Sequence, residues 1–282
     1  MKRIKSALIS VSDKSNLKPL LKILKKNKIK LISSGGTYKA IKKLKFKCLE
    51  VSDFTGTDEI LGGRVKTLHP KIFAGVLNKR KNKTHLREMR LENFENIDLV
   101  IVNFYQFEKA LKKTKNIDKI IEQIDIGGPT LARAAAKNYN DVAVISSTEQ
   151  YSELMNELRI NKGCTSLKFR EKMSRSAFTE TAFYDSVISN YFNEIANIQF
   201  PKKKIIHANL IEKLRYGENS HQQSAIYSQK EKLDLIKLHG KKLSYNNYND
   251  IFSALAIAQN LPKNIGTVII KHTNPCGVSI IK

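Results

Sequence analysis

Short apolar runs alternate with helical patterns from the N-terminus to about residue 195. The runs with the length and composition of strands are Ala7–Val11, Lys30–Ser34, Cys48–Val51, Ile97–Asn103 and Val142–Ser146. The nearly continuous apolar run at Ile97–Asn103 is typical of a strand buried on both faces of a parallel sheet. Because strands that alternate with helices favour right-handed crossovers, the sequence predicts an α/β fold with a doubly wound, mostly parallel sheet.

Polar residues and glycines follow the first two of these runs. Those that suit an anion site are Ser10, Ser12, Lys14, Ser34, Gly35, Gly36 and Thr37. In open α/β sheets a helix that starts after a strand points free N–H groups at anions, and nearby hydroxyls add donors. Two simpler interpretations stay open. Ser12 or Asp13 caps the first helix, and Gly35 and Gly36 form a plain tight turn before a helix that ends near Leu44.

The segment Gly62–Pro70 has the composition of an anion-binding loop. Arg64 and Lys66 lie two positions apart and Thr67 adds a hydroxyl. Alternate residues of an extended segment point the same way, so both cations can face one anion, with Arg as a fork of donors and Lys as a point charge. A solvated basic loop is the alternative. The similar segments elsewhere in the chain favour a site.

Candidate proton-transfer residues follow the predicted central strand. Asn103 and Tyr105 come at its carboxyl end, where open α/β sheets bind ligands. Asp125 precedes a Gly127-Gly128-Pro129 turn, and Lys137 lies on the Ala-rich helix predicted at Leu131–Asn138. One hypothesis is an Asp125–Lys137 ion pair that orients a proton-transfer group. The alternative is a turn followed by a packed helix with surface cations.

The later part of the chain divides at a predicted linker. Helices are expected at Thr84–Asn93 with Thr84 as cap, at Ile117–Ile124 and over 148–195. The segment Asn197–Lys204, with Pro201 and three lysines, is predicted to be a linker. A helix Asp250–Leu261 and a strand Thr267–Ile270 are expected beyond it. The residues after the linker are too few to bury a core of their own.

Two polar segments of this second part are candidate sites. The first, Arg215–Gln222, begins with Arg215 and Tyr216. The second is the pair Lys271-His272 at the end of the last predicted strand, where a neighbouring ammonium favours neutral imidazole. Lys271 and His272 are therefore a candidate acid–base pair, with an ordinary strand end as the alternative.

Composition narrows the classes of function. The formal charge of the 282-residue chain is +24, but the lysines are spread along its whole length, which favours an anionic small molecule over nucleic acid as partner. Its three cysteines form no C-x-x-C, so a metal site or disulfide framework is not expected. No run reaches the roughly 18 apolar residues of a membrane span, and the basic start lacks a signal sequence, so a cytoplasmic location is expected.

Seven segments together resemble the PurH family, bifunctional purine-biosynthesis enzymes that join IMP cyclohydrolase to AICAR transformylase. They are Ser10–Lys14, Ser34–Thr37, Gly62–Pro70, Asn103–Phe107, Gln123–Asn138, Arg215–Gln222 and Lys271–Gly277. The resemblance implies that residues 1–199 form a methylglyoxal-synthase-like cyclohydrolase domain. It implies that residues 200–282 are the N-terminal fragment of the transformylase domain, with an incomplete, cytidine-deaminase-like α/β fold and no expected transformylase activity.

The resemblance also implies residue roles. The cyclohydrolase closes the purine ring of FAICAR to give IMP and water, without cofactor or metal. Residues implied to bind its substrate are Ser10, Ser12, Lys14, Ser34, Gly35, Gly36, Thr37, Arg64, Thr67, Asn103 and Gly127, and those implied to be catalytic are Lys66, Tyr105, Asp125 and Lys137. In the second domain Arg215 and Tyr216 contact AICAR, while Lys271 and His272 serve formyl transfer from the cosubstrate 10-formyltetrahydrofolate. A homodimer is the expected assembly, with no nucleic-acid or membrane partner.

Three positions depart from the family pattern. Gln106 stands where Pro usually follows the tyrosine, Phe73 where His is common, and Ser220 where Pro is usual. The first two are expected near the cyclohydrolase site. Two other functions stay open: a single-activity phosphosugar enzyme of the methylglyoxal-synthase type, and a non-catalytic remnant that binds nucleotide or nucleic acid.

Overall fold

Two compact units, Met1–Ile205 and Ile206–Lys282, make up the chain in the computed structural model. The structure describes residues 1–230, 232–263 and 265–280. Residues 281–282, the end of the second predicted domain, lie outside this description. Within the described residues no helix is both long and apolar enough to cross a membrane.

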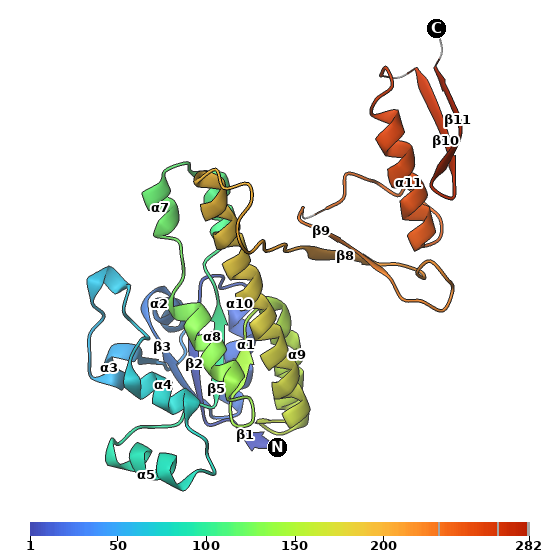
Figure 1. Cartoon of the computed structure of the whole chain (residues 1–282). Coiled ribbons are helices and arrows are strands. Elements are labelled where there is room, and N and C mark those ends of the chain that lie inside the picture. The colour runs from blue at the N-terminus through green and yellow to red at the C-terminus, as the bar shows by residue number, and fades with distance from the viewer. Residues whose placement is uncertain (231, 264, 281–282) are drawn as a thin grey trace. The chain divides into compact units, whose positions relative to one another are not determined.

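The first unit is built on a five-stranded sheet whose pairings are all parallel (Figure 1). Its strands, in spatial order, are β4 (Leu49–Glu50), β3 (Lys30–Ser33), β2 (Ser6–Val11), β5 (Leu99–Asn103) and β6 (Ala143–Ile145). After β2 the chain adds β3 and β4 on one side of it, and then returns to add β5 and β6 on the other side. The direction in which strands are added therefore reverses between β2 and β5. The doubly wound parallel sheet predicted from the sequence is confirmed, and this reversal marks where such sheets bind ligands.

Helices make up most of the rest of the first unit. They are α1 (Leu17–Lys26), α2 (Gly35–Lys43), α3 (Val51–Thr55), α4 (Pro70–Leu77), α5 (Lys83–Leu91), α6 (Phe107–Lys113), α7 (Ile117–Ile121), α8 (Gly127–Lys137), α9 (Tyr151–Ile160) and α10 (Leu167–Ile195), with short 3₁₀ turns η1 (Leu61–Gly63) and η2 (Thr148–Gln150). Helices α8 and α10 pack on each other and against the β5–β6 side of the sheet. A small antiparallel pair, β1 (Lys2–Arg3) with β7 (Cys164–Thr165), lies outside the main sheet.

The core of this unit follows from the sequence pattern. Leu17, Leu20, Leu21 and Leu24 lie one helical turn apart on α1, and each is at most 2% exposed. Burying one such leucine contributes roughly 1.5–3 kcal/mol. Strand β5 is buried from Leu99 to Val102, as expected for a central parallel strand.

Several predicted boundaries are wrong, each for a local reason. Gly35-Gly36 and Gly127-Gly128 belong to helices and not to turns before them, since α2 begins at Gly35 and α8 at Gly127. Helix α5 is capped by Asn82, whose side chain accepts the His85 N–H, and Thr84 lies inside it. The predicted helix 148–195 is divided by β7.

The cap predicted for the first helix is also wrong. Helix α1 starts at Leu17 after Asn16, which has a left-handed backbone and no side-chain cap bond. Neither Ser12 nor Asp13 caps it. The Asp13 carboxylate accepts the Ser15 N–H at 2.8 Å instead, which closes a turn ahead of the helix. The segment after β2 therefore forms a separate turn that precedes α1 and does not cap it.

The second unit contains two antiparallel strand pairs and one helix. The elements are β8 (Asn209–Lys213) with β9 (Ala225–Ser228), α11 (Tyr245–Ala258), and β10 (Gly266–Lys271) with β11 (Asn274–Ile280). Helix α11 begins before the predicted Asp250 because Ser244 and Asn247 form a capping box. Among the described residues of this unit, Tyr248 is the buried large apolar side chain, at 9% exposed.

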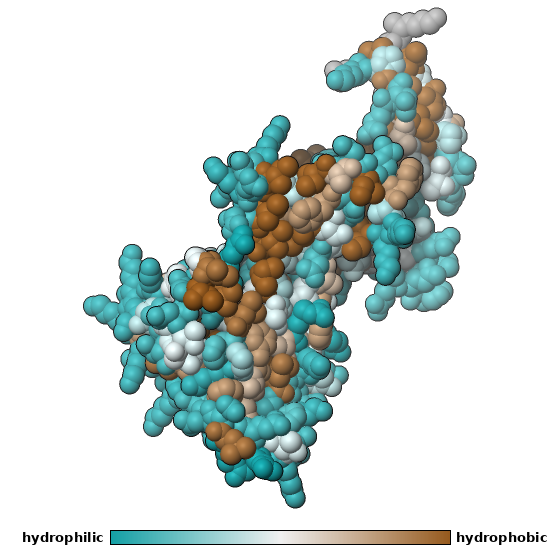
Figure 2. Space-filling view, turned by 60° about the vertical axis from the view of Figure 1, so that its left-hand side comes forward, coloured by the Kyte–Doolittle hydropathy of each residue, from teal (hydrophilic) through white to brown (hydrophobic). Residues whose placement is uncertain are grey.

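Hydrophilic side chains project over much of the molecular surface, with a band of apolar side chains between them (Figure 2). In the first unit, the exposed large apolar residues include Ile117 and Ile121 on α7 and Phe192 and Ile195 on α10. None of the lysines among the described residues is buried.

Candidate active site

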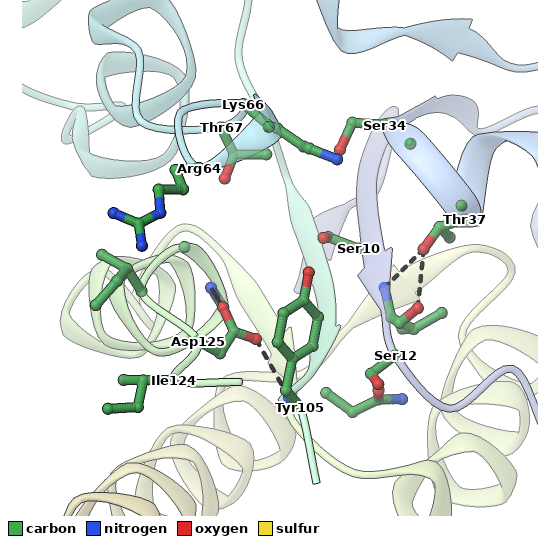
Figure 3. A pocket seen from close by; sticks show the side chains of 18 of the residues that line it. Ser10, Ser12, Ser34, Thr37, Arg64, Lys66, Thr67, Tyr105, Ile124 and Asp125 are labelled. Carbon is green, nitrogen blue, oxygen red and sulfur yellow. Dashed lines mark hydrogen bonds between the residues drawn. The ribbon is translucent and has the colours of Figure 1, made fainter. Parts of the chain in front are cut away.

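A pocket of about 580 Å³ opens where β2, β3 and β5 end. It lies at the reversal of strand order, the position that the topology favours for a ligand. Its walls come from the segment after β2, the start of α2, the loop Gly62–Leu68, Tyr105 and the segment Ile121–Gly128. Figure 3 shows hydroxyls and cations of these segments turned toward a common space.

One wall of the pocket is the N-terminus of α2. Ser34 precedes the helix in extended conformation and its side chain does not cap the first turn, so the N–H groups there can serve an anion. Gly35 has φ +51°, and a Cβ on it would lie 3.0 Å from Lys66 Nζ. A Cβ on Gly36 would lie 3.9 Å from Lys14 Nζ. A helix start and two ammonium groups thus face the same space.

The loop Gly62–Leu68 aims Lys66 at that helix start. A bridge between Ile60 and Val65 closes the loop, and its tip has left-handed backbone at Leu61, Gly62 and Gly63. A Cβ on Gly63 would come within 2.4 Å of Lys66 Cε, so the lysine stem occupies space that any side chain at this position would need. The glycine therefore serves both the turn and the course of Lys66.

Carboxylates pair with both cations of this loop. Lys66 Nζ lies 3.2 Å from Glu59 Oε2, and Arg64 pairs with Glu122 of the segment that follows α7. All four side chains are partly exposed. An anion that enters the pocket competes with these carboxylates for the two cations. The sequence interpretation missed both acids, and the spacing of Arg64 and Glu122 offered no signal for that pair.

Thr37 and Asn103 hold the segment after β2 in place. Thr37 Oγ1 accepts the Val11 N–H at 3.0 Å and donates to the Val11 carbonyl at 2.9 Å. Asn103 Oδ1 accepts the Asp13 N–H at 2.8 Å, and its Nδ2 donates to the Asp13 carbonyl at 2.9 Å. Both residues line the pocket as predicted, but these side-chain bonds already serve the backbone. Their effect is to shape the segment that carries Ser12 and Lys14.

Asp125 lies opposite the α2 wall, at the start of α8. Its Oδ1 accepts the Gly128 N–H at 2.8 Å and its Oδ2 accepts the Tyr105 N–H at 3.4 Å. Burial raises the pKa of Asp125, while the N–H groups of Gly128 and Tyr105 act in the opposite direction. A carboxyl with a raised pKa is better matched to proton exchange near neutral pH.

Two tyrosines flank this carboxyl. Tyr184 accepts the Asp125 backbone N–H at 2.7 Å and donates to the Gln123 carbonyl at 3.3 Å. Burial raises the pKa of Tyr184 to about 12, so its hydroxyl stays protonated in this frame. The Tyr105 side chain is 45% exposed, and its ring points into the pocket in Figure 3. Tyr184 positions Asp125, and Tyr105 faces the ligand space.

Lys137 lies outside the pocket, and the predicted Asp125–Lys137 ion pair is wrong. Lys137 is the exposed last residue of α8, whereas Asp125 precedes its first. Eleven helical residues span about 16 Å at 1.5 Å each, too far for contact. The other predicted residues of the first unit all line the pocket: Ser10, Ser12, Lys14, Ser34, Gly35, Gly36, Thr37, Arg64, Lys66, Thr67, Asn103, Tyr105, Asp125 and Gly127.

Neither of the two departures expected near the site lines the pocket. Gln106 follows Tyr105 and precedes α6, which it does not cap with its side chain. Phe73 lies on α4, packs against the main core and does not line the pocket. Its replacement of a common histidine therefore has no direct effect on the ligand space.

The apolar wall of the pocket was missed. Ile121, Ile124 and Ile126 line it, although Ile126 is 58% exposed. The sequence interpretation treated this stretch as an ordinary helix, but α7 ends at Ile121 and leaves the rest as a loop. The isoleucines that precede the Gly127-Gly128 pair are the sequence feature that could have indicated this wall. The pocket thus combines a cationic end with an apolar surface beside Asp125.

The remaining predicted residues belong to the second unit. The Arg215 guanidinium carbon lies 5.1 Å from the Tyr216 ring centre. Lys271 ends β10, and His272 and Thr273 form a two-residue hairpin turn with left-handed backbone at both positions. Arg215, Lys271 and His272 are exposed. Within the described residues, no cluster of three His, Cys, Asp or Glu side chains that could hold a metal ion was found.

Two protein-family models match the chain. The MGS-like domain matches residues 16–130, and the AICARFT/IMPCHase bienzyme matches residues 135–282. The second match covers more than half of the chain. The chain belongs to the AICARFT/IMPCHase bienzyme family. The resemblance inferred from seven short segments is thus confirmed.

Individual relatives agree. The bifunctional purine biosynthesis protein PurH of Bradyrhizobium diazoefficiens is 44% identical over 99% of this chain and 54% of its own length. PurH of Persephonella marina is 43% identical over 98% of this chain and 55% of its own length. The chain spans about half the length of the curated relatives it matches. The crystal structure of ForH aligns with a TM-score of 0.60 and 30% identity, over 67% of this chain and 99% of that one.

Proposed function

We propose that the pocket of the first unit closes the purine ring of FAICAR to give IMP, as an IMP cyclohydrolase. One observation carries this proposal: a single pocket combines an uncapped helix start beside Lys14 and Lys66 with a partly buried carboxyl, Asp125, on the opposite wall. The first feature suits the ribose phosphate. The second suits proton transfer at the base, which the isoleucine wall accommodates.

The reaction depends mainly on positioning, because the nucleophile and the electrophile belong to the same molecule. The carboxamide nitrogen attacks the formyl carbon of the same molecule and loses one proton. The formamide nitrogen loses a second proton as its double bond to the former formyl carbon forms, and the former formyl oxygen leaves with both protons as water. Holding both groups in reach of each other supplies much of the rate. The Lys66 ammonium stabilises the oxyanion that develops on the formyl oxygen. Asp125 and the Tyr105 hydroxyl exchange the protons between nitrogen and leaving oxygen.

Lys137 takes no step in this mechanism. It lies at the far end of α8 and outside the pocket, so a proton cannot pass directly between it and Asp125. Its side chain is exposed at the helix C-terminus, where a cation interacts favourably with the helix dipole. In this chain we assign Lys137 to helix stability.

We further propose that the domains divide at the predicted linker, with residues 1–199 as the cyclohydrolase and 200–282 as part of a transformylase domain. The relatives' bifunctional name and the family match through residue 282 support this. Formyl transfer from 10-formyltetrahydrofolate to AICAR is not expected of the 282 residues alone. Arg215, Lys271 and His272 are all exposed, and the unit around them buries little apolar surface.

The test is ring closure, followed by ultraviolet absorbance when the purified chain is mixed with FAICAR. The wild-type chain is expected to produce IMP, and Lys66→Ala to reduce kcat by about 10²-fold or more, because an oxyanion donor is lost. Lys71→Ala is the matched control, since Lys71 lies on α4 outside the pocket. Turnover that survives Lys66→Ala would contradict the site assignment. A wild-type chain that folds but produces no IMP would contradict the function.

The match of residues 16–130 to an MGS-like domain supports a second candidate, a phosphosugar enzyme with the same phosphate cradle. Such an enzyme would release inorganic phosphate from a triose phosphate. A triose phosphate has no apolar ring to pack against the wall of three isoleucines, so this is the weaker candidate. Assaying phosphate release beside IMP formation on the same preparation separates the two.

A further inference from the structure

A second pocket, of about 660 Å³, adjoins the first beside α6 and α7. It shares Ser12 and Tyr105 with the inner pocket, so the two are neighbours with a common wall. Its other lining residues are Gln106, Lys109, Ala110, Lys113, Thr114, Lys119 and Gln123. Nothing in the proposed ring closure uses this space.

The charge of this second pocket is one-sided. Lys109, Lys113 and Lys119 line it, and the lining residues that the structure describes include no carboxylate. The acids of the same helices, Glu108 and Asp118, are not among them. Among acids outside the lining, Asp13 senses Lys109, whose charge contributes to lowering the pKa of Asp13 after the hydrogen bonds from Ser15. The three ammonium groups have no ion-pair partner among the described residues.

Two of these lysines destabilise helix α6, on which they lie. Lys109 and Lys113 lie four residues apart on α6, so their charges face each other on one side of the helix. A like-charge pair at this spacing destabilises a helix. An anion between α6 and α7 would relieve that repulsion.

We propose that Lys109, Lys113 and Lys119 form an outer anion site, which receives the phosphate of the nucleotide before the nucleotide enters the inner pocket. This inference rests on the proposed function, because it takes the nucleotide monophosphate as ligand. Clefts lined by one sign of charge raise the association rate of an opposite ligand by 10-fold to 10³-fold, in a salt-dependent way. Gln106 and Gln123 add neutral donors at the rim.

The experiment measures the association rate of IMP by stopped-flow tyrosine fluorescence at several salt concentrations. The variant is the triple Lys109→Gln, Lys113→Gln and Lys119→Gln. The control triple is Lys22→Gln, Lys26→Gln and Lys28→Gln, three exposed lysines toward the C-terminal end of α1 and just after it. In a parallel sheet that end of α1 lies at the edge opposite the pocket. Both triples remove the same charge, so any effect of net charge alone appears in both.

The outer triple is expected to slow IMP association at least threefold at about 20 mM salt, and the difference is expected to vanish near 0.5 M salt, where screening is short-ranged. Inosine, which lacks the phosphate, should associate equally with all three proteins. Equal IMP rates in the two triples would overturn the outer site while leaving ring closure intact. A wild-type chain that binds IMP with these salt effects but forms no IMP from FAICAR would overturn only the proposed function. A wild-type chain that does not bind IMP would overturn both.

Discussion

The two units of this chain bury very different amounts of apolar surface. In residues 1–205 a continuous cluster of apolar side chains joins the parallel sheet to its helices. In the described part of residues 206–282, Tyr248 is the buried large apolar side chain, while Phe252 is 44% exposed and Ile269 59%. Local signals suffice for a capping box and a tight hairpin, but they do not make a core. The comparison teaches that well-formed secondary structure is no measure of independent stability.

The largest expected effect comes from separating the two units. Residues 1–205 alone should fold cooperatively, because their core lies within those residues, whereas residues 206–282 alone should show no cooperative thermal transition. Circular dichroism melting and limited proteolysis of both pieces measure this. A cooperative transition of the 206–282 piece would break the comparison.

The next effect concerns catalysis. Asp125→Asn should lower ring closure by about 10²–10⁴-fold, the usual share of a general acid or base. His272→Asn, in the exposed hairpin turn of the second unit, should leave the rate unchanged. Ultraviolet absorbance with FAICAR measures both variants, with circular dichroism as the check of folding.

The pH profile sharpens that prediction. Burial raises the pKa of Asp125, so the wild-type rate should change at a pH above 3.8, the ordinary value of a carboxyl. Asp125→Asn should remove that step. An unchanged profile in this variant would assign the proton transfer to another group.

Truncating one large apolar side chain in each unit compares the two units directly. Leu21→Ala, at 0% exposed in α1, should lower the free energy of unfolding by about 2–5 kcal/mol through lost burial and a cavity. Phe252→Ala should change it by roughly 0.5 kcal/mol or less, as is usual for exposed positions. Urea unfolding gives both values, and similar losses in the two variants would contradict the contrast between the units.

A smaller effect is expected at Asp141, which joins β1 to the body of the first unit. Burial alone would raise its pKa, but the hydrogen bond from Lys2 and the Arg80 N–H lower it overall. A lowered native pKa contributes stability above pH 3.8, and this contribution is lost as the pH falls through the native pKa. Asp141→Asn should therefore be less stable than wild type at pH 7, and the difference should shrink toward pH 2–3. Urea unfolding at both pH values tests this sign.

The smallest effect concerns the Lys66–Glu59 pair. Glu59→Gln should tighten IMP binding by up to about fivefold, because partly exposed ion pairs contribute about 0.2–1 kcal/mol and the ligand would no longer displace one. Glu153→Gln is the control, since Glu153 pairs with Lys172 away from the pocket. Titration calorimetry measures both. Weaker binding in Glu59→Gln would mean that Glu59 helps to position Lys66.

The sequence was enough to predict the sheet and most of the pocket, because both depend on local signals. Apolar runs mark the strands, and the ends of β2, β3 and β5 must meet in a parallel sheet. The Asp125–Lys137 pair failed because Asp125 and Lys137 were assigned to a turn and a later helix, whereas α8 starts at Gly127 and separates them. Glu122 was missed because its partner Arg64 is distant in sequence. Contacts between distant loops leave no periodic pattern to read.

The carboxylate of Asp125 also begins α8, through the hydrogen bond from the Gly128 N–H. A protonated carboxyl accepts that bond more weakly than a carboxylate does. Each proton that Asp125 takes up in the proposed cycle therefore loosens the first turn of the helix, and each proton it releases tightens it again. The protonation state of Asp125 and the opening of the first turn of α8 would then change together. Amide hydrogen exchange at Gly128 would therefore report on the catalytic proton.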